Sequence, residues 1–456
     1  MPTTRRNSTL IRRRLQRAGT VLSFVVATLA LAACSNLLEV KYPGRIPVEQ
    51  LNSPSLAGVL ADGVVGDLEC AYNNYFSGSS AHSDEFETAN DNGTLANAGE
   101  RNITSNNDDY ATSACEASSL NTAGDFGLQV PMHTARFQSE DVFNRLKGWT
   151  DAQVKNRTAL QAKVRAYGAF AYTFFGETYC TFAVDGGAAG PVSVASNTAA
   201  QEFAEAIQLA NTAITAGQTS TNPSLPEIIG MSNVGLARVN MDLKKWPEAA
   251  SFAQKVAPGF EVFADRGTEN DRRWNKMFYL FTDLGAYTIA CALRPTHASL
   301  GALDGPCGTT PPLDDPRLPV VDAGKGAFNP PIRLWIQTKF RDLGQKVRLA
   351  SYKEARLILA EAQAQQGLVS DAQTTINNYR DLYSLPHLTF ANKPDAIAKI
   401  LHERRMELAF EGGHRLNDLL RYQIAWKPSG TSNPFTGRPY GSTTCWPTPT
   451  KETNGN

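Results

Sequence analysis

The sequence predicts a mainly α-helical fold, and three observations support this. Residues 152–176 carry apolar residues at helical spacing along one face. Two later stretches, 231–257 and 351–380, share a pattern typical of paired helices. Few segments alternate apolar and polar residues as half-buried strands do. With 42% hydrophobic and 19% charged residues, the 456-residue chain has enough apolar side chains to bury a core.

The helix predicted over 152–176 is the clearest element. Its apolar positions recur at steps of four, three, four and three residues: Leu160, Val164, Tyr167, Ala171 and Phe174. Gly176 follows and is a candidate C-cap, because glycine adopts the left-handed conformation that often ends a helix. Further helices are predicted over 199–216, 393–411 and 413–422.

The two later stretches resemble parts of a tetratricopeptide repeat. In that repeat, small residues allow two paired helices to approach closely. Ala237 and Ala249 lie twelve residues apart in one stretch, and Ala360 and Ala372 have the same spacing in the other. The shared spacing predicts an α-helical scaffold of tetratricopeptide-like helix pairs.

Three regions have the composition of long loops. Residues 77–125 are rich in Ser, Asn, Asp, Gly and Thr, and residues 294–331 contain eight prolines. After residue 426 the chain is rich in Pro, Gly and Thr. The apolar stretch 277–293 between these regions is expected to be a buried helix, because Asp283 interrupts it. Loops of such length are often functional, so we expect them to contribute to a site.

The N-terminus has the layout of a lipoprotein signal peptide. Residues 1–33 contain six Arg and no acid, and an apolar run over 21–33 is too short to span a bilayer. The run ends in Leu31-Ala32-Ala33-Cys34, which resembles the bacterial lipobox. We therefore predict three parts: a signal peptide over 1–33, the lipidated Cys34 with a tether over 34–50, and a single domain over 51–456. Acyl chains on Cys34 would anchor the protein to a membrane. The choice between general and twin-arginine export remains open at this point.

Removal of the signal peptide changes the charge of the protein. The whole chain has 44 basic and 44 acidic residues, and loss of six Arg leaves 38 basic residues and a formal charge of −6. A nucleic-acid binder usually has a strong basic excess. The charge therefore predicts no nucleic-acid partner.

Six cysteines remain after Cys34, an even number in an exported chain. They are disulfide candidates: Cys70, Cys115, Cys180, Cys291, Cys307 and Cys445. Six cysteines allow 15 pairings. Proximity in the sequence favours Cys70 with Cys115 and Cys291 with Cys307.

The motif search predicts no catalytic residue, cofactor or metal site. His402-Glu403 begins like a zinc-protease motif, but Met406 stands where the second His belongs. Nucleophile-elbow and phosphate-loop motifs are also missing from the sequence. A glycan hydrolase needs only two carboxylates placed by the fold, so this class stays open. Arg404 and Arg405, among glutamates, are interpreted as part of a helix held by ion pairs.

Several aromatic residues are candidates for stacking on a sugar, because the apolar face of a pyranose packs on an aromatic ring. The ligand-binding candidates are Tyr72 and Tyr75, which are expected on a loop with Phe76, and Trp274 and Trp335, with Phe278.

Short motifs occur in order along the chain. The longest comprises Glu403-Arg404-Arg405, Glu407-Leu408 and Phe410-Glu411-Gly412. Others are Leu37-Leu38-Glu39-Val40, Arg165-Ala166-Tyr167 with Phe174-Phe175-Gly176-Glu177, Asp315-Pro316-Arg317-Leu318, Lys339-Phe340, Ala360-Glu361-Ala362, Leu416-Asn417-Asp418-Leu419 and Trp446-Pro447-Thr448-Pro449. This set resembles the motifs of the SusD/RagB family of nutrient-binding outer-membrane lipoproteins.

The resemblance implies a SusD-like helical fold with ligand-binding loops. It implies a surface-facing outer-membrane protein that captures oligosaccharides or other nutrients without covalent chemistry. The implied partner is a SusC-like TonB-dependent barrel that receives the ligand. Asp84 lies roughly where some family members place a ligand contact. The alternatives are a surface glycan hydrolase and a helical-repeat lipoprotein of envelope assembly.

Overall fold

The computed structural model describes most of the chain after residue 50. The described residues are 51–90, 93–106, 115, 127–183, 190–219, 223–295, 307, 313, 315–329 and 332–450. The predicted signal peptide, Cys34 and the tether over 34–50 lie outside them and stay predictions. The chain divides into two units, 1–52 and 53–456, and every element below belongs to the second.

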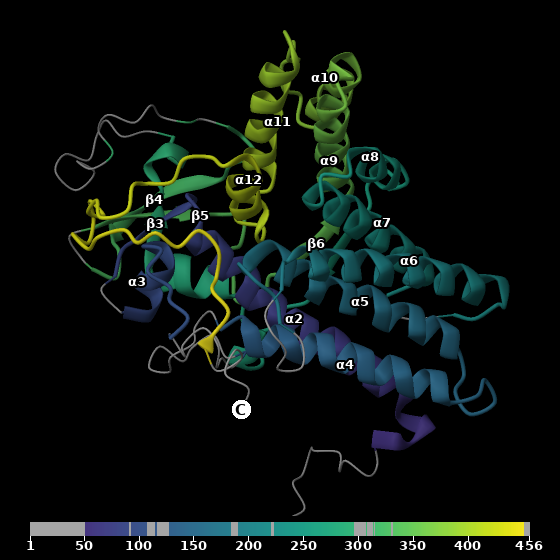
Figure 1. Cartoon of the computed structure of the whole chain (residues 1–456). Helices are drawn as coiled ribbons and strands as arrows, with labels where there is room; N and C mark the ends of the chain where they lie inside the picture. Colours follow the sequence, from purple (N-terminus) through teal and green to yellow (C-terminus); the bar gives the residue numbers. More distant parts are fainter. Residues whose placement is uncertain are drawn as a thin grey trace, which may run out of the picture. The chain divides into compact units, whose positions relative to one another are not determined.

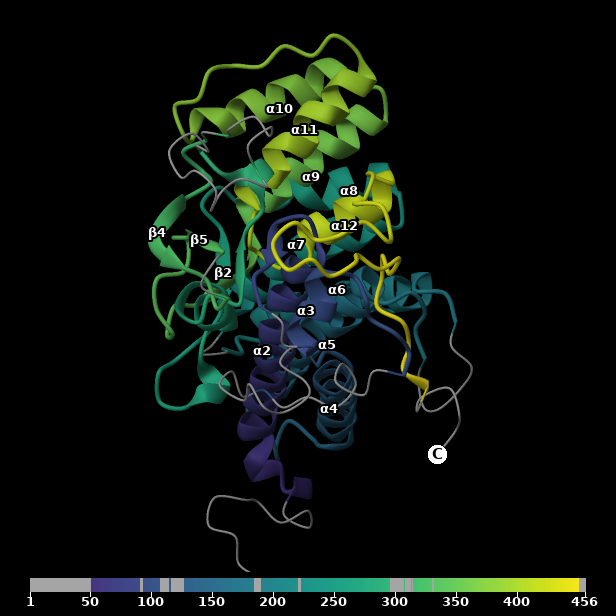
Figure 2. The ribbon, with the colours of Figure 1, turned by 90° about the vertical axis from the view of Figure 1, so that its left-hand side faces the viewer.

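The predicted mainly α-helical fold is confirmed (Figure 1). The first group of helices is α2 (Ala57–His82), α3 (Gly93–Gly99), α4 (Gln129–Gly148), α5 (Arg157–Thr178), α6 (Ser193–Thr215) and α7 (Leu225–Asp242). The second group is α8 (Trp246–Gln254), α9 (Tyr352–Gln365), α10 (Val369–Asp381), α11 (Lys393–Glu407) and α12 (His414–Tyr422). In Figure 2, α9, α10 and α11 form the top of the unit and α4 lies near its base.

Helix α5 is the centre of the first group. It contacts α2, α4, α6 and α7, and side chains on almost every face of it are buried. The single apolar stripe predicted from the sequence is therefore part of a helix that is enclosed on all sides. The helix also continues past Gly176 to Thr178, so the predicted C-cap is wrong. Gly176 instead allows a close approach, because a Cβ there would lie 2.4 Å from the hydroxyl of Ser196 on α6.

The two predicted helix pairs are α7 with α8 and α9 with α10. The small residues of each pattern, Ala237 and Ala249 in one pair and Ala360 and Ala372 in the other, are fully buried. Helix α8 also packs on α9, so the pairs are consecutive layers of one scaffold. A separate apolar cluster holds α9, α10 and α11 together.

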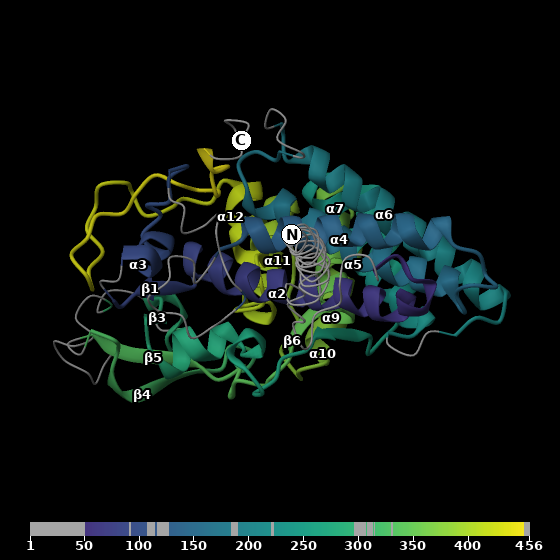
Figure 3. The ribbon, with the colours of Figure 1, turned by 90° about the horizontal axis from the view of Figure 1, so that it is seen from below.

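Short strands form three antiparallel pairs in the described residues. These are β1 (Phe86–Thr88) with β3 (Tyr287–Ile289), β2 (Glu261–Ala264) with β6 (Val347–Ser351), and β4 (Val320–Gly326) with β5 (Arg333–Gln337). The Thr288 hydroxyl joins β3 to β5, because it accepts a hydrogen bond from Trp335 N (2.9 Å) and donates one to Arg333 O (2.9 Å). Figure 3 shows β1, β3, β4 and β5 gathered beside α3.

Two expectations from composition are wrong. The Ser- and Asn-rich region begins with the last turns of α2, which reaches His82, and it also contains β1 and α3. The hydroxyls of Ser77 and Ser79 donate to backbone oxygens four residues earlier (2.6 and 2.5 Å), so these serines are satisfied inside a buried helix. The apolar stretch 277–293 is a π-helical turn, Met277–Asp283, followed by β3, because Gly285 turns the chain with a φ of 69°. Residues 91–92, 107–114 and 116–125 of the first region lie outside the described part.

Three disulfides join the six cysteines: Cys70–Cys115, Cys180–Cys445 and Cys291–Cys307. The first and third are the pairs that proximity favours, and the second closes a separation of 265 residues. None of the helices that the structure describes is both long and apolar enough to cross a bilayer.

Candidate functional site

The C-terminal motif on α11 forms ion pairs in the interior. Glu403 accepts hydrogen bonds from Arg317 (2.5 Å) and Arg380, and Arg404 lies 3.0 Å from Asp418. These side chains are buried, and each charge meets an opposite charge, as buried charges require. The interpretation of this helix as one held by ion pairs therefore agrees with the structure.

Arg405, the next residue of the motif, faces a pocket. Its guanidinium lies 3.3 Å from the Asp84 carboxylate, which also accepts two hydrogen bonds from Arg415, both of 2.6 Å. Burial raises the pKa of Asp84, but hydrogen bonding by Arg415 and the charge of Arg405 outweigh it and hold this pKa below its ordinary value. Asp84 is therefore a carboxylate at the pocket that is held by Arg415 and orients Arg405, the arginine that lines the pocket.

The pocket encloses about 490 Å³, within the range of small-molecule sites. It forms where α2 ends, beside β1, the residues after β3, α11 and the segment 425–440. Its lining residues are Ser83, Asp84, Phe86, Glu87, Gly99, Arg101, Ala290, Cys291, Ala292, Arg405, Leu419, Ala425, Trp426, Lys427, Pro428, Thr431, Ser432, Pro434 and Tyr440. Apolar surface and charged groups therefore meet in one hollow.

Trp426 is the half-exposed aromatic residue of this pocket. The Arg101 guanidinium lies over its ring, 5.1 Å from the centroid, and the His82 ring lies 5.9 Å away. Burial lowers the pKa of His82 to about 4, so that ring is neutral at physiological pH. Arg101 has a φ of 57°, an uncommon value for a residue other than glycine, so the backbone is held in a particular form at this wall.

Hydrogen bonds fix the polar side chains opposite Trp426. The Tyr440 hydroxyl donates to Glu87 (2.9 Å), and the Lys427 ammonium donates to the Tyr440 hydroxyl (3.0 Å) and to Glu87. The pocket thus combines an aromatic ring with oriented donors and acceptors. Such a combination suits a polyhydroxylated ligand, whose C–H face packs on a ring and whose hydroxyls hydrogen-bond.

The structure corrects three of the predicted ligand-binding residues. Tyr72, Tyr75 and Trp335 are 1%, 0% and 2% exposed, so no ligand can reach their rings. Tyr72 and Tyr75 lie within α2 and not on a loop, and their hydroxyls donate to Arg348 O (2.5 Å) and to Glu177. Trp335 lies on β5 in the core. The rings of Tyr72, Tyr75 and Trp335 pack in the hydrophobic core.

Of the two other candidates, Asp84 lines the pocket and Trp274 does not. Trp274 is half-buried and packs against Tyr279, with the ring centroids 5.4 Å apart. Sequence reasoning missed Trp426, Tyr440 and Arg101. The position of Trp426 beside a Pro-, Gly- and Thr-rich segment is the sequence signal that could have identified it as a candidate. The described residues contain no group of three His, Cys, Asp or Glu side chains placed to hold a metal ion.

Comparisons with known proteins agree with this fold. Residues 347–455 match the model of the SusD family. A SusD superfamily protein of Bacteroides vulgatus matches with a TM-score of 0.61 and 15% identity over 88% of this chain and 96% of its own. A SusD-like carbohydrate-binding protein of Bacteroides fragilis matches with a TM-score of 0.59 and 13% identity over 89% and 98%. A search among curated proteins finds no match to the sequence.

The predicted SusD/RagB resemblance is confirmed. Residues 347–455 match the SusD family model, and the fold is similar to that of SusD-like structures over most of the chain.

Proposed function

We propose that this protein is a substrate-binding lipoprotein of the outer membrane that captures oligosaccharides or other nutrients at the cell surface. Cys34 would carry the lipid anchor, and a SusC-like TonB-dependent barrel would receive the ligand. The role is binding and hand-over, without covalent chemistry. SusD-like carbohydrate-binding proteins of Bacteroides have the same fold, which supports a glycan as the ligand.

The observation that carries this proposal is the pocket around Trp426. Its ring is half-exposed, whereas Tyr72, Tyr75 and Trp335 are enclosed. Arg101, Glu87 and other lining residues supply hydrogen-bond donors and acceptors to the same pocket. Its volume of about 490 Å³ leaves room for a ligand. Asp84 would act by positioning Arg405 and Arg415.

A glycan array followed by calorimetry with the full-length protein tests the site. We expect Trp426→Ala to weaken binding of the identified glycan at least tenfold, because stacking on one ring is lost. Trp274→Ala is the matched control, since Trp274 is also half-buried but lies outside the pocket. Equal losses in the two variants, or a loss only in Trp274→Ala, would remove the pocket from the proposal.

The anchor and the partner need separate tests. Cys34→Ala should move the protein from the membrane to a soluble fraction, and retention in the membrane would contradict the lipid anchor. Purification from outer membranes should recover a TonB-dependent barrel. Recovery of the protein alone would count against hand-over while leaving ligand binding untouched.

A further inference from the structure

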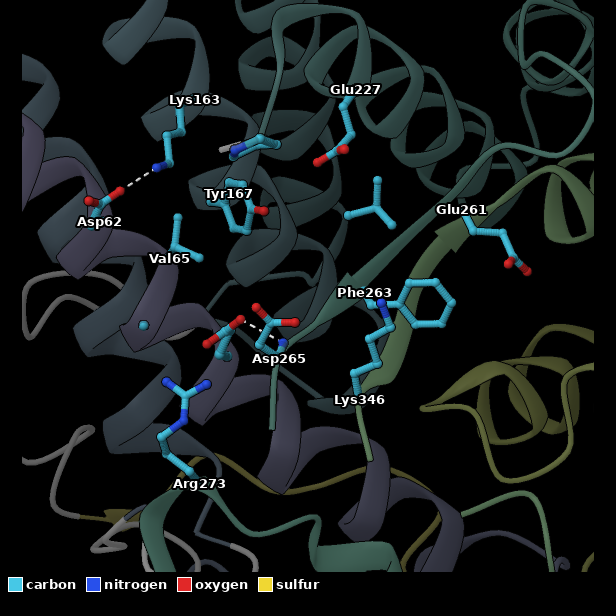
Figure 4. Close-up of a pocket in the computed structure, with 14 residues that line it drawn as sticks. Asp62, Val65, Lys163, Tyr167, Glu227, Glu261, Phe263, Asp265, Arg273 and Lys346 are labelled. Carbon is cyan, nitrogen blue, oxygen red and sulfur yellow. Dashed lines mark hydrogen bonds and ion pairs between the residues drawn. The ribbon is translucent and has the colours of Figure 1, made fainter. Parts of the chain in front are cut away.

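A second cavity lies away from the Trp426 pocket and shares no lining residue with it (Figure 4). It encloses about 540 Å³ between α2, α5, the start of α7, strand β2 and Lys346, the residue before β6. Its lining residues are Asp62, Val65, Gly66, Glu69, Lys163, Tyr167, Pro223, Glu227, Glu261, Val262, Phe263, Asp265, Arg273 and Lys346. The size suits a small molecule.

Most of the carboxylates here already have partners. Asp62 pairs with Lys163 (2.5 Å), and Glu261 pairs with Arg348 outside the lining (2.9 Å). Glu69 accepts a hydrogen bond from the backbone N of Asp265 (2.7 Å). These three carboxylates form part of the cavity wall, and their existing partners make them poor candidates for binding a ligand.

Two carboxylates have no ion pair among the described residues: those of Glu227 and Asp265. Burial raises the pKa of Glu227, which means that its negative charge lacks compensation. Figure 4 shows Glu227 and Asp265 on opposite sides of the Tyr167 ring. Bound cationic groups would offset these negative charges.

Tyr167 provides an observation independent of the acids. Its side chain lines the cavity although the residue is only 5% exposed, and its hydroxyl has no hydrogen-bond partner in the part of the chain that the structure describes. Burial raises the pKa of Tyr167, and the charges of Glu69, Glu227 and Asp265 raise it further. The phenol therefore keeps its proton, and its unused oxygen points into the space between the two carboxylates (Figure 4).

An aromatic ring at the far wall already binds an ammonium group. The Lys346 Nζ lies 4.4 Å from the centroid of the half-buried Phe263 ring, a cation–π contact.

We propose that this cavity binds a small ligand through protonated amines that pair with the Glu227 and Asp265 carboxylates, with the Tyr167 oxygen as a further acceptor. An ammonium group has three donors and no acceptor, which suits a wall that offers carboxylate and phenol oxygens. The ligand class includes amino sugars and linear polyamines. The cavity would give the protein a second, charge-selective site besides the Trp426 pocket.

Calorimetry with the full-length protein tests this with three probes. The glucosamine trimer carries free amines, the N-acetylglucosamine trimer is the same chain without the charges, and spermidine is an amine without a sugar. We expect the glucosamine trimer to bind at least tenfold more tightly than its acetylated counterpart. Binding of spermidine as well would assign the site to amines in general, and binding of the glucosamine trimer alone would assign it to amino sugars. Equal binding of the two trimers, or no binding of any amine at millimolar concentration, would overturn the proposal.

Variants locate the site. Glu227→Gln and Asp265→Asn should each weaken amine binding about tenfold, and Tyr167→Phe should weaken it several-fold without loss of packing. Glu248→Gln removes one exposed negative charge on α8, outside the cavity, and should leave the affinity unchanged. Repeating the titration with Trp426→Ala separates the two sites, since amine binding should survive in that variant. Loss of binding in Trp426→Ala, or an equal loss in Glu248→Gln, would contradict the assignment.

Discussion

Two consecutive arginines on α11 show how one sequence motif serves two regions of the molecule. The Arg404 side chain is 1% exposed and lies between Glu361 and Asp418, which are equally buried. The Arg405 side chain is 19% exposed and reaches Asp84 at the pocket, whose own side chain is 35% exposed. A helix turns about 100° per residue, so neighbours point in different directions. One arginine therefore holds the scaffold together, and the other lines the pocket.

The difference in burial between Arg404 and Arg405 indicates where the loss of an ion pair should destabilise the fold most. A buried ion that loses its partner leaves an uncompensated charge in the interior, whereas a partly exposed ion is still solvated by water. The same substitution should therefore have unequal effects at the two positions.

The largest expected effect is that of Arg404→Met. It leaves the buried carboxylates of Glu361 and Asp418 with Arg421 as their remaining nearby cation (2.8 Å from each). We expect the free energy of unfolding to fall by about 3–5 kcal/mol, as measured by urea unfolding. The matched control is Arg405→Met, which should cost about 1 kcal/mol or less, because Arg415 still pairs with Asp84. Similar losses in the two variants would show that burial does not separate these regions.

A second comparison uses two glycines. Gly413 follows the motif with a φ of 77°, and a Cβ there would lie 1.7 Å from the Tyr75 hydroxyl oxygen. Gly437, in the pocket segment, has a φ of 73° and no atom within 4 Å of such a Cβ. Gly413→Ala should lower the free energy of unfolding by about 2–4 kcal/mol, through strain and overpacking together.

Gly437→Ala should lower the free energy of unfolding by about 1 kcal/mol, since only the backbone strain applies. The difference between the two variants in urea unfolding isolates the steric contribution on the buried side. If both cost the same, Tyr75 moves aside freely and the packing there is looser than the structure indicates.

The smallest effect concerns a buried acid whose charge is poorly compensated. Glu202 on α6 contacts Arg165 (3.0 Å), but its second carboxylate oxygen has no hydrogen-bond partner in the described residues. Burial raises the pKa of Glu202 to about 8, although Arg165 opposes the shift. The folded state therefore holds this proton more tightly than the unfolded state, and the resulting stability is lost as the pH rises from about 4.5 to 8.

Glu202→Gln cannot lose a proton, so it should be more stable than the wild type at pH 8, by about 1–2 kcal/mol, and nearly equal to it below pH 4.5. Melting temperatures across this range provide the measurement. Glu205→Gln is the control, because Glu205 also contacts Arg165 (2.8 Å) but is more exposed. A gain that does not depend on pH would point to packing rather than to charge.

The sequence predicts the helical scaffold well, because spacing along a helix is local information. Ala237 with Ala249 and Ala360 with Ala372 identify the two helix pairs without any knowledge of their neighbours. The lining of the pocket is different, because Asp84 and Trp426 lie 342 residues apart and only the tertiary fold brings them together.

Composition also misleads where polar side chains satisfy themselves. Ser77 and Ser79 suggested a loop, and that expectation placed Tyr72 and Tyr75 on the surface. The hydroxyls of Ser77 and Ser79 instead donate hydrogen bonds within α2, so the helix continues, and both tyrosines are buried. Nothing in the local pattern distinguishes such serines from those of a loop.

The Cys180–Cys445 disulfide determines how the chain carries mechanical load. A pull between the two ends of the protein would pass along the backbone to Cys180, at the end of α5, and cross directly to Cys445. The residues between these cysteines, with Trp426, Tyr440 and both helix pairs, lie outside this covalent path. The Cys70–Cys115 disulfide bypasses residues 71–114 in the same way. A transport machine that pulled on either end would therefore load α2 up to Cys70, α4 and α5, and the pocket segment would carry no covalent load.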